Sequence, residues 1–220
     1  MNSDFHIHLK NGVSNIEIIK EYLDKCLEKK IDKVLFLDHG NRISQNHKPV
    51  LYNKEIILDF FKNIDSVKDL YPGITIYKGI EVDYSIDKDF CDNEITLMKL
   101  GFDYIIGSVH GYKNYSKDEY YKRNLDMLDI YPINILGHLR LWEDYLDYSL
   151  VIEEIVKKCG QKGISIEIST STRAMWSKEQ YLFMNNLINK YNVTTTVGSD
   201  AHNVDEIAIN FELLKEYKGD

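Results

Sequence analysis

Strand-like and helix-like segments alternate along this chain, and this alternation constrains its fold more than any other feature. Residues 34–37 (Val-Leu-Phe-Leu) form a continuous apolar run, which is typical of a strand buried on both faces. Other segments carry apolar residues at intervals of three and four, as Ile16, Ile19 and Leu23 do, which indicates a helix with one buried face. Strands that alternate with helices through short connections predict a parallel sheet covered by helices.

The alternation has a period of about thirty residues, the length of a strand–helix–strand unit. Strands are predicted at residues 4–9, 33–38, 75–83, 104–109, 133–137, 165–168 and 194–199. Helices are predicted at residues 15–28, 53–70, 88–99, 117–128, 149–159, 178–189 and 204–217. The polar connection at residues 41–53 is the longest, and it is a candidate lid or substrate loop.

An open, doubly wound sheet would show the same alternation. Its functional residues, however, would gather near the point where the strand order reverses. Here, histidines and acids follow nearly every predicted strand, which favours a closed barrel in which all strand ends meet at one mouth. We therefore expect an α/β fold, a distorted (β/α)7 barrel with a metal site at the C-terminal ends of its strands.

The bulk properties of the chain limit its function and its location. Its 220 residues suit one domain spanning residues 1–220. The net charge of −8 argues against nucleic-acid and membrane-surface partners, because both are anionic. The three cysteines, Cys26, Cys91 and Cys159, have no disulfide or zinc spacing, and Cys26 and Cys159 lie in helical patterns as small buried hydrophobes. With no secretory signal and no membrane-spanning run, a cytoplasmic location is expected.

The side chains at the predicted strand ends are those that bind zinc, manganese or iron. His6 and His8 share one face of the first strand because they are two residues apart. Glu81 lies in a buried strand, where a carboxylate between two cations would avoid the energetic cost of an unpaired charge. The remaining candidates each end another strand: His39, His110, His138, Asp200 and His202.

Each of these residues also has an ordinary interpretation. A single His-x-His pair is common on solvent-facing strands, and a lone histidine at a strand end is usually a hydrogen-bonded rim residue. The repetition at equivalent strand ends favours a shared metal site. Asp83 is expected to be an ordinary loop acid, and His47 a surface residue.

Two arginines are candidate substrate-binding residues. Arg173 follows the sixth predicted strand, and its guanidinium could bind phosphate through two hydrogen bonds. Arg140, two residues after His138, is the second candidate.

With these motifs in their order, the chain resembles the polymerase-and-histidinol-phosphatase (PHP) family, and within it the monofunctional histidinol-phosphate phosphatases. The resemblance covers nearly the whole chain through His6-x-His8, Asp38-His39, Gly79-Ile80-Glu81-Val82-Asp83, Gly107-Ser108-Val109-His110, Gly137-His138-Leu139, Glu167-Ile168-Ser169-Thr170 and Gly198-Ser199-Asp200-Ala201-His202.

The resemblance implies two or three divalent metal ions (Zn, Mn or Fe). One ion would take His6, His8, Glu81 and Asp200, and a second would share Glu81 and take His110 and His138. A third would use His39 and His202. Family members usually carry an acid or histidine where this chain has Ser14, so the third ion would be weakly held, completed by phosphate, or absent.

The expected activity is therefore that of a metal-dependent phosphomonoesterase, and the resemblance implies L-histidinol phosphate as substrate and a place in histidine biosynthesis. Asp200, His202, His39 and Arg173 would be the catalytic residues, with Arg173 offsetting phosphate charge and His202 or His39 protonating the leaving alcohol. The alternatives are a PHP phosphatase acting on phosphotyrosine, a sugar phosphate or a nucleotide, and a non-catalytic metal-binding module. An amidohydrolase-like enzyme would usually have a carbamylated lysine where Glu81 lies.

Overall fold

The computed structural model describes residues 2–9, 15–40, 42–43, 49–50 and 54–219. Ser14, His47 and most of the candidate lid at residues 41–53 lie outside these ranges. Within that loop, the described segments β3 (Arg42–Ile43) and β4 (Pro49–Val50) form a two-stranded antiparallel pair.

Seven parallel strands form one sheet, and their spatial order is their order along the chain. The strands are β1 (Ser3–His8), β2 (Lys33–His39), β5 (Thr75–Asp83), β6 (Tyr104–Ser108), β7 (Ile135–Leu136), β8 (Ser165–Ser169) and β9 (Thr195–Gly198). The order never reverses, so the sheet is not doubly wound. The predicted distorted (β/α)7 barrel is confirmed.

The first and last strands meet just beyond the end of β9. The N–H of His8 donates to the carbonyl oxygen of Ala201 at 2.8 Å, and the N–H of Ala201 donates to the carbonyl oxygen of His6 at 3.3 Å. The buried Asp4 carboxylate accepts from the N–H groups of Ser199 at 2.9 Å and Ala208 at 3.0 Å. These bonds bring the segment after β9 beside the histidines of β1.

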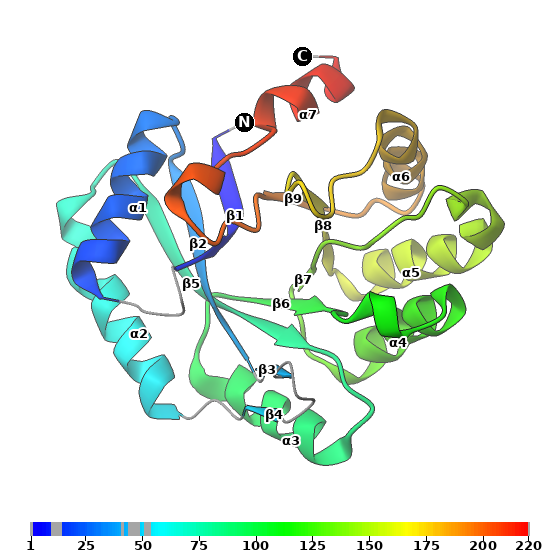
Figure 1. The fold of residues 1–220 in the computed structure, drawn as a ribbon, viewed down its shortest axis with the longest axis horizontal. Helices are drawn as coiled ribbons and strands as arrows, with labels where there is room; N and C mark the ends of the chain where they lie inside the picture. The colour runs from blue at the N-terminus through cyan, green and yellow to red at the C-terminus, as the bar shows by residue number, and fades with distance from the viewer. Residues whose placement is uncertain (1, 10–14, 41, 44–48, 51–53, 220) are drawn as a thin grey trace.

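Helices surround the strands on the outside (Figure 1). They are α1 (Ile16–Glu28), α2 (Lys54–Val67), α3 (Lys88–Leu97), α4 (Lys117–Ile130), α5 (Ser149–Lys162), α6 (Lys178–Lys190) and α7 (Phe211–Lys218). Several begin at side-chain N-caps: the side chains of Asn15, Ser116 and Ser177 accept a hydrogen bond from a backbone N–H in the first turn of α1, α4 and α6.

The strand side chains alternate between two apolar layers. Val34 and Phe36 of β2 point outward and pack in the large core beneath the helices, which also contains the buried Cys26 of α1. Leu35 and Leu37 point inward and join Ile106 and Ile135 in a small cluster inside the barrel. One end of the barrel is therefore filled with hydrocarbon, so polar groups gather at the other end.

The segment at residues 204–217 is not the single helix that the sequence predicts. A short 3-10 turn, η6 (Val204–Glu206), precedes α7, and both Ala208 and Asn210 between them have left-handed backbones. The Asp4 carboxylate holds the Ala208 N–H, and the Asn210 amide donates to the carbonyl oxygen of Thr170 at 2.9 Å. These tertiary bonds outweigh local helix propensity.

Among the described residues, the longest apolar helical stretches are too short and too polar to cross a membrane. The cytoplasmic location stays a prediction.

Candidate metal centre

Imidazoles from several strands surround one buried carboxylate, that of Glu81. The nearest Glu81 oxygen lies 2.9 Å from Nε2 of His138, 3.2 Å from Nε2 of His8 and 3.3 Å from Nδ1 of His39. Nε2 of His6 and Nε2 of His110 follow at 3.6 and 3.5 Å. The strand ends therefore meet at Glu81, as expected for residues at the C-terminal mouth of a parallel barrel.

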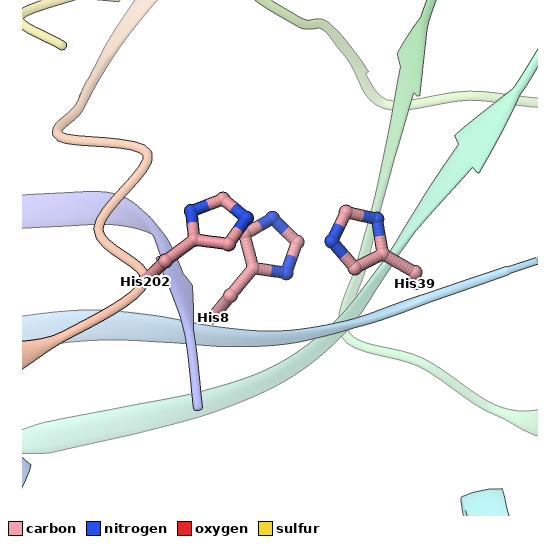
Figure 2. A group of neighbouring side chains, drawn as sticks. All are labelled: His8, His39 and His202. Carbon is pink, nitrogen blue, oxygen red and sulfur yellow. The ribbon is translucent and has the colours of Figure 1, made fainter. Parts of the chain in front are cut away.

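Three groups of these side chains have nitrogen or oxygen atoms close enough to hold an ion. The first combines His6, His8 and Glu81, and the second combines Glu81, His110 and His138. The third combines His8 with His39 and His202, whose rings lie side by side in Figure 2. His8 in the third group is a difference from the ligand set that the sequence suggested, which had only His39 and His202.

Asp200 adds a second carboxylate to the first group. Its Oδ1 lies 3.6 Å from Nε2 of His6 and 3.9 Å from Nε2 of His8. Its backbone is left-handed, with φ of 50°, a conformation that Asp tolerates better than most residues. All eight predicted ligands thus lie at one site, and their role as ligands stays a prediction.

The atoms of the site match what a cation requires. Two nitrogens, from His8 and His39, lie within 3.3 Å of Glu81 Oε2, yet this buried oxygen accepts no hydrogen bond. Burial raises the pKa of the Glu81 carboxyl, but the positive charges of His110 and His6 outweigh it and hold the pKa well below its ordinary value. Burial lowers the pKa of His8 to about 4, so its imidazole is neutral. Burial also lowers the pKa of His6, but the Glu167 and Glu81 charges outweigh it and raise that pKa well above its ordinary value, so a divalent ion would displace one proton from this ring. This donor set fits divalent metal ions of the zinc, manganese or iron type.

Glu167 is the most important residue of the site that was not predicted from the sequence. One of its oxygens accepts from Nδ1 of His6 at 2.8 Å, and the other accepts from the backbone N–H of His138 at 2.6 Å. A proton on Nδ1 leaves the lone pair of His6 Nε2 directed into the site, the usual arrangement behind a metal-binding histidine. The sequence held a signal, since an acid at the centre of an apolar strand needs a partner.

Gly198 allows this contact. A Cβ atom at residue 198 would lie 2.1 Å from Glu167 Oε1 and 2.5 Å from Cβ of His6. Only glycine lets β9 approach so closely.

Asp83 is not the ordinary loop acid that the sequence suggested. It is the last residue of β5, and its Oδ1 accepts from the backbone N–H of His110 at 3.1 Å and lies 3.5 Å from Nδ1 of the same residue. Burial lowers the pKa of His110, but the Glu81 and Asp83 charges outweigh it and raise that pKa to about 10. Asp83 therefore positions His110.

A cavity of about 420 Å³ opens from this centre. Arg173, in the turn after β8, donates to the carbonyl oxygen of Asp200 at 3.0 Å, and its Nη2 lies 3.2 Å from Nδ1 of His202. Arg140 reaches the same turn, where its Nη1 donates to the carbonyl oxygen of Arg173 at 3.0 Å. Both predicted substrate-binding arginines thus line the cavity that contains Glu81.

Comparisons with known proteins give one family and two informative structures. The family model of the PHP domain matches residues 4–171. The crystal structure of histidinol phosphate phosphatase from Lactococcus lactis subsp. lactis Il1403, complexed with zinc, L-histidinol and phosphate, is 18% identical with a TM-score of 0.74. The match covers 98% of this chain and 93% of that one.

A chain in the cryo-EM structure of an archaeal ribonuclease P with mature tRNA is 15% identical with a TM-score of 0.61, over 98% of this chain and 82% of the other. At these identities, both structures show a shared fold. No curated protein sequence matches the chain.

Proposed function

The chain belongs to the PHP domain family, and from this membership and the geometry of its cavity we propose that it is a metal-dependent phosphomonoesterase. One observation carries the proposal: a buried carboxylate, Glu81, lies within 3.6 Å of nitrogens from five histidines, at the closed end of a cavity that also contains arginines. Such a site brings cations, phosphate-binding groups and proton donors to one substrate.

The ligand assignment follows the three groups. The first ion would be held by His6, His8, Glu81 and Asp200, the second by Glu81, His110 and His138, and a weaker third by His39 and His202 together with His8. Divalent ions there would supply Lewis acidity, which neutralises phosphate oxygens and lowers the pKa of water.

The surrounding residues bind and protonate the substrate. Arg173 directs its guanidinium toward the cavity beside Asp200, where it would hold two outer oxygens of the phosphoryl group. Nδ1 of His202 lies 3.0 Å from the carbonyl oxygen of Asp200, which can only accept a hydrogen bond, and 3.2 Å from Arg173 Nη2, which can only donate one. When no third ion is bound, His202 would protonate the leaving alkoxide, with His39 as the alternative acid if it is unligated.

The substrate proposed from family resemblance is L-histidinol phosphate, and the alternatives are another small phosphate ester or phosphotyrosine. The Lactococcus structure supports this order of preference, because that protein is a histidinol phosphate phosphatase in complex with L-histidinol and phosphate. A non-catalytic module of a nucleic-acid enzyme, suggested by the ribonuclease P likeness, is less consistent with a chain of net charge −8.

The test is phosphate release from a panel of phosphomonoesters after reconstitution with zinc, manganese or iron(II). We expect turnover that depends on added metal and is absent from Glu81→Ala. Metal-loaded protein that releases no phosphate from any ester would support the non-catalytic module instead.

A further inference from the structure

The charged side chains that line the cavity outside the metal centre are all cationic in the described part of the chain. They are Lys113, Arg140 and Arg173, and the two lining carboxylates, Glu81 and Asp200, belong to the metal centre. The chain as a whole has 35 acidic and 27 basic residues, so an average surface of this protein would carry more acids than bases. The three bases around this cavity are therefore a local departure from the composition of the chain. One of them, Arg173, would bind the phosphoryl group under the proposed function. Lys113 and Arg140 have no ligand assigned to them.

Arg140 is held in place without a charged partner. Its guanidinium stacks 4.1 Å above the ring of Tyr112, and its backbone N–H donates to the Tyr120 hydroxyl at 2.8 Å. Its Nε is buried and has no hydrogen-bond acceptor. By contrast, Arg123 pairs with Glu119, whereas no described carboxylate lies within 4.0 Å of the Arg140 guanidinium.

Lys113 lies one residue after Tyr112, in the short turn η4 (Tyr112–Asn114), on the same side of the cavity as the stacked ring. It also has no carboxylate within 4.0 Å among the described residues, although nearby Lys117 pairs with Asp144. Two unneutralised cations, one of them fixed by stacking, thus lie beside the site that would take the phosphoryl group.

We propose that Arg140 and Lys113 form a second anion-binding subsite, so that the substrate is a phosphomonoester with a second anionic group, a carboxylate or a further phosphate. The proposal rests on the phosphomonoesterase function. Arginine binds either group through paired hydrogen bonds, and the partly buried position strengthens each of them. A substrate whose tail carries an ammonium group, as L-histidinol phosphate does, would meet cations there, and the described lining offers it no carboxylate outside the metal centre. The subsite therefore favours the alternative small phosphate esters over L-histidinol phosphate.

Three non-hydrolysable phosphonates of matched length separate these cases: 3-phosphonopropionate, propylphosphonate and 2-aminoethylphosphonate, with anionic, neutral and cationic tails. Their dissociation constants would be measured by calorimetry on metal-loaded protein. We expect 3-phosphonopropionate to bind about tenfold more tightly than propylphosphonate, since a hydrogen bond to a charged group has about this effect. The cationic analogue should bind most weakly.

Arg140→Gln keeps a donor for the Arg173 carbonyl but removes the charge, so the ratio between the anionic and neutral analogues should fall to about one. Lys113→Ala should lower the same ratio by a smaller factor. Lys99→Ala, which removes an exposed lysine outside the cavity, is the charge-matched control and should change nothing.

Equal binding of the three analogues by the wild type would overturn the subsite. So would an Arg140→Gln variant that weakens all three alike, because Arg140 would then contact the phosphoryl group itself. Phosphate release from 3-phosphoglycerate and from glycerol 3-phosphate, esters with and without a carboxylate, reports on the proposed function separately. Turnover of these esters without a preference for anionic tails overturns the subsite alone, and a preference in binding without turnover of either ester overturns the phosphatase function.

Discussion

The buried base of the metal centre, here called the inner wall, and the rim of the cavity are built in different ways. The inner wall, formed by His6, His8, Glu81 and Glu167, comes from strands, and its side chains are at most 3% exposed. The rim, formed by Lys113, Arg140, Arg173 and His202, comes from the segments that follow strands, and the side chains of Arg173 and His202 are 55% and 40% exposed.

Because of this difference, we expect the inner wall to determine metal binding and catalysis and the rim to determine which substrate binds. A buried charge is tolerated only with partners on several sides, so the inner wall is a network in which each member needs the others. Water screens the charges of the rim residues, so each of these residues can be substituted without unfolding the barrel. We expect substitutions in the wall to remove both metal and activity, and substitutions on the rim to affect substrates.

The largest effect is expected at the centre of the inner wall. Glu81→Ala removes the carboxylate nearest to His8, His39 and His138, so the ions would lose their common ligand and repel each other unscreened. Metal content should fall and kcat should drop by about a thousandfold or more. Elemental analysis and phosphate release measure both, with exposed Glu216→Ala as control. Retention of both metal and activity would refute the shared-ligand role.

A smaller but still large effect is expected behind the ligands. Glu167 accepts from Nδ1 of His6 with one oxygen and from the His138 N–H with the other. Glu167→Gln keeps the shape but has only one acceptor atom, so one of these bonds must be lost. Metal affinity should fall about 10- to 100-fold.

The 15N shifts of the His6 ring would show whether its tautomer changes in Glu167→Gln, a change that a general loss of stability would not produce. Exposed Glu154→Gln is the control. An unchanged tautomer and unchanged metal affinity would mean that Glu167 only supports the fold.

On the rim, Arg173→Ala should leave metal content intact and lower kcat/KM by about 30-fold, the effect of losing a charge-assisted hydrogen bond to phosphate. Arg173→Lys keeps the charge but loses the paired geometry, so it should recover only part of the rate. Wild-type kcat/KM in Arg173→Ala would contradict the phosphate role, and loss of metal would show that rim and wall are not separate.

The histidines of the metal centre were largely predictable from the sequence. Strand-end histidines follow from the two-residue period of a strand and from the shared mouth of a parallel barrel, which together place His6, His8, His110 and His138 at one site. The alternation of buried residues also gave the number and order of strands.

The remaining features depend on contacts between distant residues. The break before α7 follows from bonds of Asp4 and Thr170 to residues 208 and 210, which no local pattern contains. Glu167 was not identified because its contact with His6 forms only when the barrel closes and brings the β8 side chain to the histidines of β1, although an acid within an apolar strand was a signal. Arg140 and Tyr112, which stack on each other, lie in two different turns. The hydrophobic periodicity of helices and strands does not predict the backbone conformation of such turns, so this contact could not be predicted from the sequence.

The smallest effect concerns the third ion, which would lie between wall and rim. Its group contains His8, His39 and His202 and no carboxylate, and His8 is shared with the first group. The carboxylate near this group, that of Glu81, would be shared with the other two ions, so the third ion should be held more weakly than they are. Ser14, where related proteins usually have an acid or histidine, lies outside the described residues.

Ser14→Asp should therefore tighten the third ion by about tenfold and leave the other two unchanged, since a carboxylate adds both charge and an oxygen ligand. Equilibrium dialysis in phosphate-free buffer, followed by elemental analysis, gives the stoichiometry, and Ser14→Ala controls for loss of the hydroxyl. Three tightly held ions in the wild type without any added anion would show that another residue completes this group. The serine at residue 14 would then not limit metal content, and the third ion would be held as tightly as the two ions of the inner wall.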